Sequence, residues 1–139
     1  AYEMLRSLVG SEMCIRDRYR TMMGITPEEM IEECVRSGVD LIGANCGNGF
    51  ERMVELLGFF KRYSPNLPFV VHANAGIPYN RNGITVFPET PSDAARYVPD
   101  LIKYGARIIG GCCGTTPEHI SAIASVVQSF TRGRLNNGL

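Results

Sequence analysis

Three of the five cysteines fall in glycine-rich turns, each directly after a predicted buried strand. Cys112 and Cys113 stand side by side in "GGCCGTTPEHI", residues 110–120, and Cys46 stands in "GANCG". Because the carboxyl ends of parallel strands open on one side of a sheet, we expect these three thiols to converge there. Neighbouring residues of an extended strand point to opposite sides, so both members of the pair can reach one ion only if the backbone turns. The three glycines that flank the pair give the backbone that freedom.

Three converging thiolates predict a zinc site with a free position. Zn²⁺ binds thiolates at about 2.3 Å in a tetrahedron, and catalytic zinc keeps an exchangeable fourth position whereas structural zinc is closed. The helix expected from Pro117 directs its positive end at the pair, which favours thiolates over thiols. A substrate thiol that enters the fourth position would lose its proton and stay nucleophilic. The chemistry indicated is attack by a substrate sulfur on an alkyl group.

Other interpretations of these residues stay open. The cysteine pair could fill the core or form a redox couple, although a disulfide between neighbours is strained and no CxxC spacing is present. His72, at the end of another predicted strand, could complete a closed structural Cys3His zinc module without catalysis. Asn74 could be a weak, displaceable ligand or a turn residue bonded to its own backbone. We expect Cys34 to lie in the core and His119 to face solvent.

Helical and strand-like segments alternate from Thr21 onward. Thr26 and Glu29 predict a capping box, and Pro99 should kink or shorten the helix that contains it. The expected helices cover 26–38, 50–63, 92–103 and a segment from Pro117 through Val127; the expected strands cover 39–45, 68–74 and 106–111; a loop rich in glycine, proline and asparagine covers 76–91. The expected core faces are Met30, Ile31, Cys34 and Val35 on the first helix, and Met53, Val54, Leu57 and Phe60 on the second.

This alternation predicts an α/β fold with parallel strands and crossover helices that cover both faces of the sheet. Residues 38–47, "GVDLIGANCG", align with residues 105–114, "GARIIGGCCG", so that Cys46 matches Cys113. A (β/α)8 TIM barrel produces such near-repetition and takes about 250 residues. We therefore expect the C-terminal part of a barrel, with open sheet edges that leave the isolated chain marginal or prone to aggregate.

Composition and charge exclude several classes of protein. Fourteen basic residues balance fourteen acidic ones among 139, which argues against nucleic acid as a partner, and no apolar run approaches the length of a membrane span. We expect a cytoplasmic protein, since an odd number of cysteines in turns suits a reducing compartment. Residues 7–20 resemble a translated sequencing adapter, so residues 1–20 are interpreted as non-native, 21–130 as the partial barrel domain and 131–139 as a tail. A genuine N-terminal helix is the alternative for the first segment.

With these motifs assembled, the chain from about Arg20 to Gln128 resembles the C-terminal half of the homocysteine S-methyltransferase family, through "GANCG", "NAG" and "GGCCGTTPEHI". The resemblance implies a barrel in which Cys46, Cys112 and Cys113 bind Zn²⁺, homocysteine displaces Asn74, and the homocysteine thiol takes a methyl group to form methionine. Ala73 departs from the proline that the cobalamin-dependent branch commonly has before the asparagine.

The resemblance also implies which compounds could be the methyl donor. The stretch over 74–91, "NAGIPYNRNGITVFPETP", and the run "GGCCGTTPEHI" look closest to the cobalamin-dependent branch, with cobalamin carried on another domain and recharged by methyltetrahydrofolate. Betaine or S-methylmethionine as donor, and another thiol or selenol as acceptor, are the alternatives. Because the N-terminal half of the family's barrel is missing, we expect the isolated fragment to be inactive.

Overall fold

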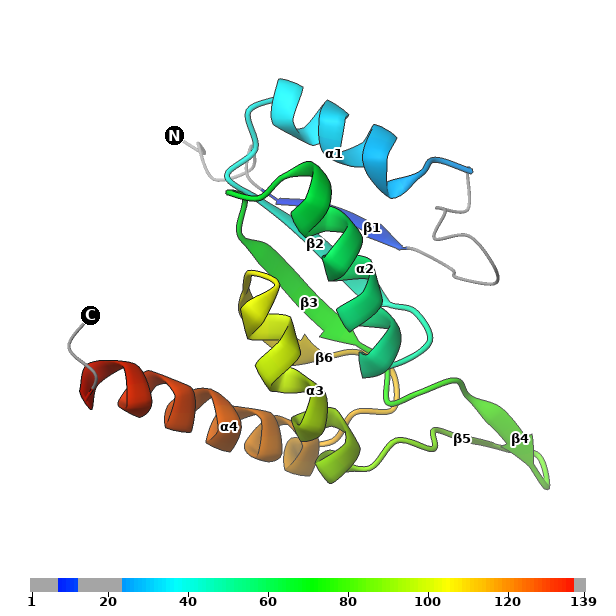
Figure 1. The fold of residues 1–139 in the computed structure, drawn as a ribbon. Helices are drawn as coiled ribbons and strands as arrows, with labels where there is room; N and C mark the ends of the chain where they lie inside the picture. Colours follow the sequence, from blue (N-terminus) through cyan, green and yellow to red (C-terminus); the bar gives the residue numbers. More distant parts are fainter. Residues whose placement is uncertain (1–7, 13–23, 137–139) are drawn as a thin grey trace, which may run out of the picture.

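Alternating helices and strands make up the described part of the chain, residues 8–12 and 24–136 of this computed structural model (Figure 1). The elements are β1 (Leu8–Glu12), α1 (Pro27–Arg36), β2 (Leu41–Cys46), α2 (Phe50–Tyr63), β3 (Phe69–Ala73), β4 (Tyr79–Arg81), β5 (Ile84–Val86), α3 (Pro91–Lys103), β6 (Ala106–Gly111) and α4 (Pro117–Asn136). The prediction of an α/β fold with parallel strands and intervening helices is confirmed.

The main sheet has the strand order β1-β2-β3-β6, and all of its pairings are parallel. The three strands expected from the sequence are β2, β3 and β6. β1 was not expected, and it lies within the segment interpreted as adapter-derived. It pairs with β2 from Leu8 opposite Leu41 to Glu12 opposite Asn45, so this stretch is a strand and not the alternative helix. Cys14 lies outside the described residues.

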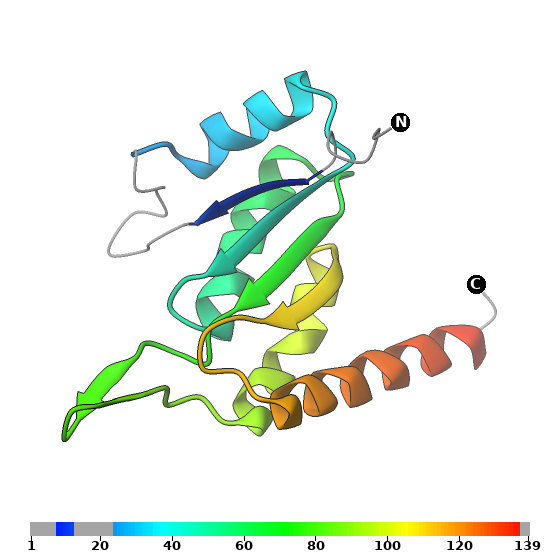
Figure 2. The same cartoon turned by 180° about the vertical axis from the view of Figure 1, so that it is seen from behind.

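Helices cover only one face of this sheet in the described part of the chain, so the expectation of two covered faces is wrong there. Ile42, Val71 and Ala73 are at most 1% exposed beneath the helices, whereas Ile108 is 49% exposed on the opposite face. Seen from behind, that face of the strands is open (Figure 2). The chain steps from β2 to β3 to β6 in one direction, and right-handed crossovers made in one direction place their helices on the same side.

The helix boundaries follow local sequence signals. α1 and α3 each begin with a capping box, Thr26 with Glu29 and Thr90 with Asp93, and the first of these was predicted. The expectation that Pro99 shortens its helix is wrong, because α3 continues to Lys103 with Val98 and Leu101 fully buried on either side of the proline.

The predicted helix faces are confirmed in most positions. Met30, Ile31 and Cys34 of α1 are buried, but Val35 is 53% exposed, because it lies at the edge of the helix face. On α2 the buried residues are Phe50, Met53, Leu56, Leu57 and Phe60, with Val54 partly buried. The core therefore lies between the sheet and the layer of helices.

The loop expected over residues 76–91 contains an antiparallel hairpin, β4 with β5, that projects from the end of the sheet where β2 and β3 terminate (Figures 1 and 2). Its turn residues Asn82 and Gly83 both have positive φ, 53° and 84°, as a tight Asn-Gly hairpin requires. The hairpin side chains are largely exposed, and Ile84 reaches 67%.

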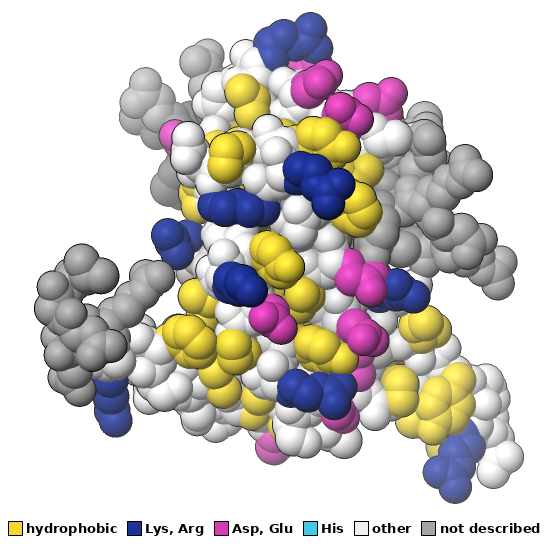
Figure 3. Space-filling model, viewed as in Figure 1, with side chains coloured by type: hydrophobic (Ala, Val, Ile, Leu, Met, Phe, Trp, Pro, Cys, Tyr) yellow, Lys and Arg dark blue, Asp and Glu magenta, His cyan; other side chains and the backbone are white. Residues whose placement is uncertain are grey.

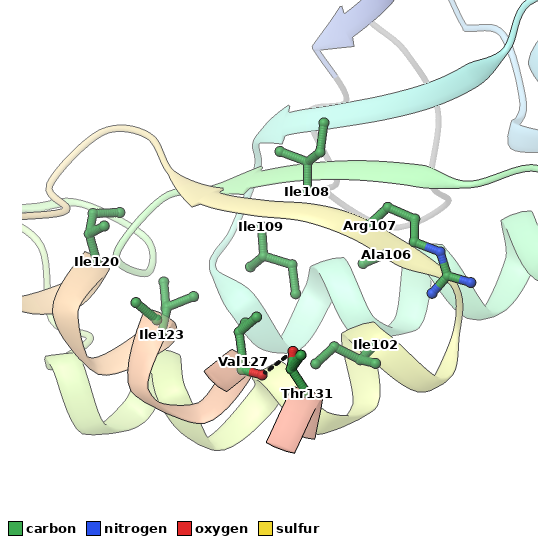
Figure 4. A pocket seen from close by; sticks show the side chains of 10 residues that line it. Ile102, Ala106, Arg107, Ile108, Ile109, Ile120, Ile123, Val127 and Thr131 are labelled. Atoms are coloured by element: carbon green, nitrogen blue, oxygen red, sulfur yellow. Dashed lines mark hydrogen bonds between the residues drawn. The ribbon is translucent and has the colours of Figure 1, made fainter. Parts of the chain in front are cut away.

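α4 packs against α3 and the β6 edge, and it continues to Asn136, into the segment expected to be a tail. An apolar groove of about 460 Å³ lies between β6 and α4 (Figure 4). Its lining includes Ile109, Ile123 and Val127 and none of the cysteines. On the helical face, acidic and basic side chains are interspersed, without a field of one sign (Figure 3). No helix in the described ranges is long and apolar enough to cross a bilayer.

Candidate metal centre

The three cysteines singled out in the sequence lie together at the carboxyl ends of the strands. Cys46 is the last residue of β2, and Cys112 and Cys113 follow β6 directly. Their sulfur atoms all lie within 4.8 Å of one another. Cys112 Sγ is 3.1 Å from Cys46 Sγ and 3.9 Å from Cys113 Sγ. The predicted convergence of three thiols is confirmed. Cys34 is separate from this cluster and buried in the core, as expected.

Backbone turns place the sulfur atoms. Cys46 itself has φ of 61°, a left-handed conformation that is uncommon outside glycine, and Gly47 continues the turn with φ of 65°. After the cysteine pair, Gly114 makes the equivalent turn with φ of 78°. The aligned glycines of the two repeated stretches, Gly47 and Gly114, therefore have the same role.

Gly110 and Gly111 serve another purpose than the expected backbone freedom, since neither has positive φ. A Cβ atom at Gly110 would lie 2.9 Å from the His72 ring, and one at Gly111 would overlap Thr115. Thr115 Oγ donates a 2.7 Å hydrogen bond to the Cys112 carbonyl. These two glycines allow close packing beside the cysteine pair.

Hydrogen bonding between the thiols of Cys46 and Cys112 moves their pKa values in opposite directions. The hydrogen bond with Cys112, and then burial, raise the pKa of the Cys46 thiol to about 12. Burial opposes ionisation of Cys112, but the hydrogen bond from Cys46 and bonds involving Cys113 lower its pKa overall. Asn45 Nδ2–H also donates to Cys46 Sγ at 3.2 Å. The contact between these two sulfur atoms therefore favours ionisation of Cys112 over ionisation of Cys46.

Asn74, just past β3, joins the two cysteine loops. Its Nδ2–H donates to the Gly47 carbonyl, and its Oδ1 accepts from Cys113 N–H, both at 3.0 Å. Its own N–H donates to the Cys46 carbonyl at 3.1 Å. The residue is 9% exposed. The amide thus holds the loops together from the strand between them.

His72 does not join the thiols. It is exposed and lies over Gly110 on the open face of the sheet, one residue before Ala73, which pairs with Cys46. Strand alternation directs the His72 side chain to the face opposite that of Ala73. Among the residues that the structure describes, no histidine, aspartate or glutamate completes the cysteine group. A closed Cys3His site with His72 as fourth ligand is therefore not formed.

His119 is buried, at 5% exposure, so its expected position in solvent is wrong. Its Nδ1 accepts from Thr116 N–H at 3.1 Å, which leaves the proton on Nε2 for donation to the Glu89 carbonyl at 2.9 Å. The imidazole thereby caps the start of α4 and connects it to the loop before α3. Its partner Glu89 is distant in sequence, which is why the sequence did not reveal the burial.

Glu89 is a second residue near the centre that sequence reasoning missed. Its carboxylate accepts from Phe50 N–H at 3.2 Å, at the start of α2. Burial, despite that hydrogen bond, raises the pKa of this carboxyl. One signal was present: α2 begins after Gly49, which offers no side chain to cap the helix, so an acceptor from elsewhere was required.

The donor set fits a thiophilic divalent cation. Tetrahedral bonds of about 2.3 Å to zinc place sulfur atoms about 3.8 Å apart, close to the spread of separations found here. Two helices, α2 and α4, begin just beyond the cysteine loops and direct the positive ends of their dipoles to this edge of the sheet. Three sulfur ligands leave one position of a tetrahedron for another group.

Comparison with known proteins places these features in a family. A sequence model described as homocysteine S-methyltransferase matches residues 4–127. A methionine synthase of Mycobacterium tuberculosis is 38% identical over 96 residues, which is 68% of this chain and 8% of that protein. A methionine synthase of Mycobacterium leprae is 35% identical over 102 residues, 73% of this chain and 8% of that protein.

Homocysteine S-methyltransferase 1 of Saccharomyces cerevisiae is 36% identical over 93 residues, 66% of this chain and 28% of that protein. The chain thus spans a small part of the length of each of these relatives. The match to the family model covers nearly the whole chain, including all three clustered cysteines. The chain belongs to the homocysteine S-methyltransferase family.

Proposed function

We propose that this chain is part of a zinc-dependent enzyme that transfers a methyl group to the thiol of homocysteine, forming methionine. The observation that carries the proposal is the cluster of three thiols within 4.8 Å, assembled from loops 66 residues apart. Cys46, Cys112 and Cys113 would hold the ion. Membership of the family supports homocysteine as the acceptor and a methyl donor as the second substrate.

In this proposal the chain's own residues prepare the site for a guest thiol. Cys112, whose pKa is lowered, favours the thiolate form, and protons leave the cysteines as the ion binds. Bound zinc would supply a positive charge that favours the thiolate form of the substrate sulfur. Asn74 holds the Cys46 and Cys113 loops in register and is the proposed displaceable ligand.

The proposed parent fold is a (β/α)8 barrel of which this chain is the C-terminal part. Within residues 8–12 and 24–136, helices cover one face of the sheet, the other face is open and the β6 edge is unpaired, as an arc of a barrel wall would be. The small share of the relatives' length supports a longer protein. Without the remaining strands, we expect the isolated chain to lack activity.

For the methyl donor we propose methylcobalamin recharged by methyltetrahydrofolate, with betaine or S-methylmethionine as the alternative. Two of the relatives are named methionine synthase and one homocysteine S-methyltransferase, at similar identity, so these names do not decide the donor. The choice depends on the stretch over 74–91 and on the run over 110–120. The free thiols of the four described cysteines support a reducing compartment such as the cytoplasm.

The test is metal content and turnover of the full-length protein that carries this chain. We expect one zinc per chain and formation of methionine from homocysteine. Cys112→Ala should lose both the zinc and the activity. Cys34→Ala is the control: it removes a core thiol outside the cluster, and its folded fraction should keep both. Activity that persists in metal-free protein would refute the proposal.

A further inference from the structure

The segment Phe87–Glu89 packs against all three loops of the candidate metal centre. Each loop has a glycine with positive φ within three residues after its functional side chain: Gly49 after Cys46, Gly76 after Asn74 and Gly114 directly after Cys113. A Cβ atom at these glycines would overlap Glu89, Pro88 and Phe87, respectively. One short segment, distant in sequence from both cysteine loops, therefore contacts every part of the centre.

Within this segment, Glu89 makes one polar contact to the Asn74 loop and one to the start of each helix that follows a cysteine loop. Its N–H donates to the Ala75 carbonyl at 3.0 Å, beside Asn74. Its carbonyl accepts from His119 Nε2–H at 2.9 Å, at the start of the helix that follows the cysteine pair. Its carboxylate accepts from Phe50 N–H at 3.2 Å, at the start of the helix that follows Cys46. Only the last contact depends on the side chain.

The carboxylate contact is the one that bears on Cys46. α2 has no capping side chain of its own, and its first-turn N–H groups need an acceptor. Three residues separate Cys46 from Phe50, and the backbone between them turns through two glycines with positive φ. Such a turn has many alternative conformations once its far end is released. Asn74 holds the first part of this turn through the Cys46 and Gly47 carbonyls, and the bond from Phe50 N–H to Glu89 holds its far end, so both limit where the Cys46 sulfur lies relative to Cys112.

We propose that Glu89 is a positioning residue for the metal centre: its carboxylate, by capping α2, holds the Cys46 loop at the distance that lets three sulfur atoms share one ion. This inference rests on the proposed metal-binding function. It differs from a purely structural cap in one consequence, because loss of the carboxylate should weaken metal binding and not only the stability of the fold.

The experiment titrates the full-length protein with Co²⁺ and follows the thiolate-to-cobalt absorption, with Zn²⁺ in competition. Glu89→Ala should bind the metal about 10-fold or more weakly, the range found when groups that orient metal ligands are removed. Glu89→Gln retains an oxygen acceptor for Phe50 N–H and should restore most of the affinity. Glu29→Ala is the control, since the Glu29 carboxylate also accepts from a backbone N–H at the start of a helix, that of Thr26 before α1, in a part of the chain separate from the segment Phe87–Glu89.

Gly49→Ala tests the same contact from the other side and covers the case in which Glu89→Ala does not fold. Its Cβ would overlap the carboxylate without removing it, and would also lie 3.0 Å from the Gly76 backbone at a residue with φ of 105°, so metal binding should weaken at least as much as in Glu89→Ala. If Glu89→Ala or Gly49→Ala binds cobalt as tightly as wild type with an unchanged spectrum, the positioning role is wrong although the metal site stands. If folded wild-type protein binds no cobalt or zinc, the proposed function itself fails.

Discussion

At the scale of single residues, Cys46 combines a strained backbone with a required side chain. A left-handed conformation costs a non-glycine residue about 1–2 kcal/mol, so a glycine at this position would relax the turn. The conformation is held by the bond from Asn74 N–H to the Cys46 carbonyl and by the capped helix that follows. Strain of this kind persists where its surroundings over-determine it, and functional sites are where it gathers.

Gly114 offers a direct measurement of how tightly the corresponding turn is built. Gly114→Ala adds a side chain at φ of 78° and into the Phe87 ring, so we expect the free energy of unfolding to fall by about 1–2 kcal/mol from the backbone alone. Gly133→Ala is the control, because it lies within α4 with open space around it and should raise helix stability by about 0.5–1 kcal/mol. Urea unfolding followed by circular dichroism measures both. Equal effects of the two substitutions would contradict the packing described here.

At the scale of elements, local signals determine where helices begin. α1 and α3 carry complete capping boxes with proline at the start. The start of α2 receives the Glu89 carboxylate from elsewhere in the chain, whereas α4 is capped by its own His119, whose ring contacts the Glu89 carbonyl. The helices with capping boxes lie away from the thiols. The two that start at the cysteine loops are both in contact with Glu89, which the fold brings there from the loop before α3.

Asp93 makes the start of α3 sensitive to pH. Hydrogen bonds from Thr90 Oγ and Thr90 N–H lower the pKa of the Asp93 carboxyl. Because this pKa is lower in the folded state than in the unfolded state, the ionised carboxylate stabilises the fold at pH values above the ordinary carboxyl pKa. That stabilisation is lost as the pH falls through the lowered value. Asp93→Asn should therefore reduce the midpoint of thermal unfolding at about pH 6 and have less effect at about pH 3. A difference between the two proteins that stays constant over this range would contradict the assignment.

The sequence sufficed for features that rest on local pattern. The capping box of Thr26, the strand ends at Cys46 and Cys112 and the core position of Cys34 follow from spacing alone. The Asn82–Gly83 hairpin carried a local signal that was interpreted only as loop. The burial of His119, the role of Glu89 and the pairing of β1 with β2 depend on partners far along the chain, which no local pattern contains.

At the scale of the whole molecule, the sheet ends at β6 with one edge unpaired in the described residues and one face open. Ile108 is half exposed on that face, and the apolar groove between β6 and α4 adjoins the edge. Natural proteins cover or charge such edges, because unpaired strands associate with other chains. The arrangement suits a wall that continues into further strands.

The isolated chain should therefore self-associate through this edge. Ile108→Lys places a charge on the open face of β6 itself. Because inward-pointing charges on an edge strand oppose pairing with another strand, the substitution should shift the chain towards monomer in sedimentation velocity. Ile84→Lys removes an even more exposed isoleucine from the hairpin, away from this edge, and should leave the association unchanged. If the wild-type chain stays monomeric at every concentration, or if both lysines have equal effects, the β6 edge needs no partner. If only Ile108→Lys relieves the association, the β6 edge is the surface through which the chain associates.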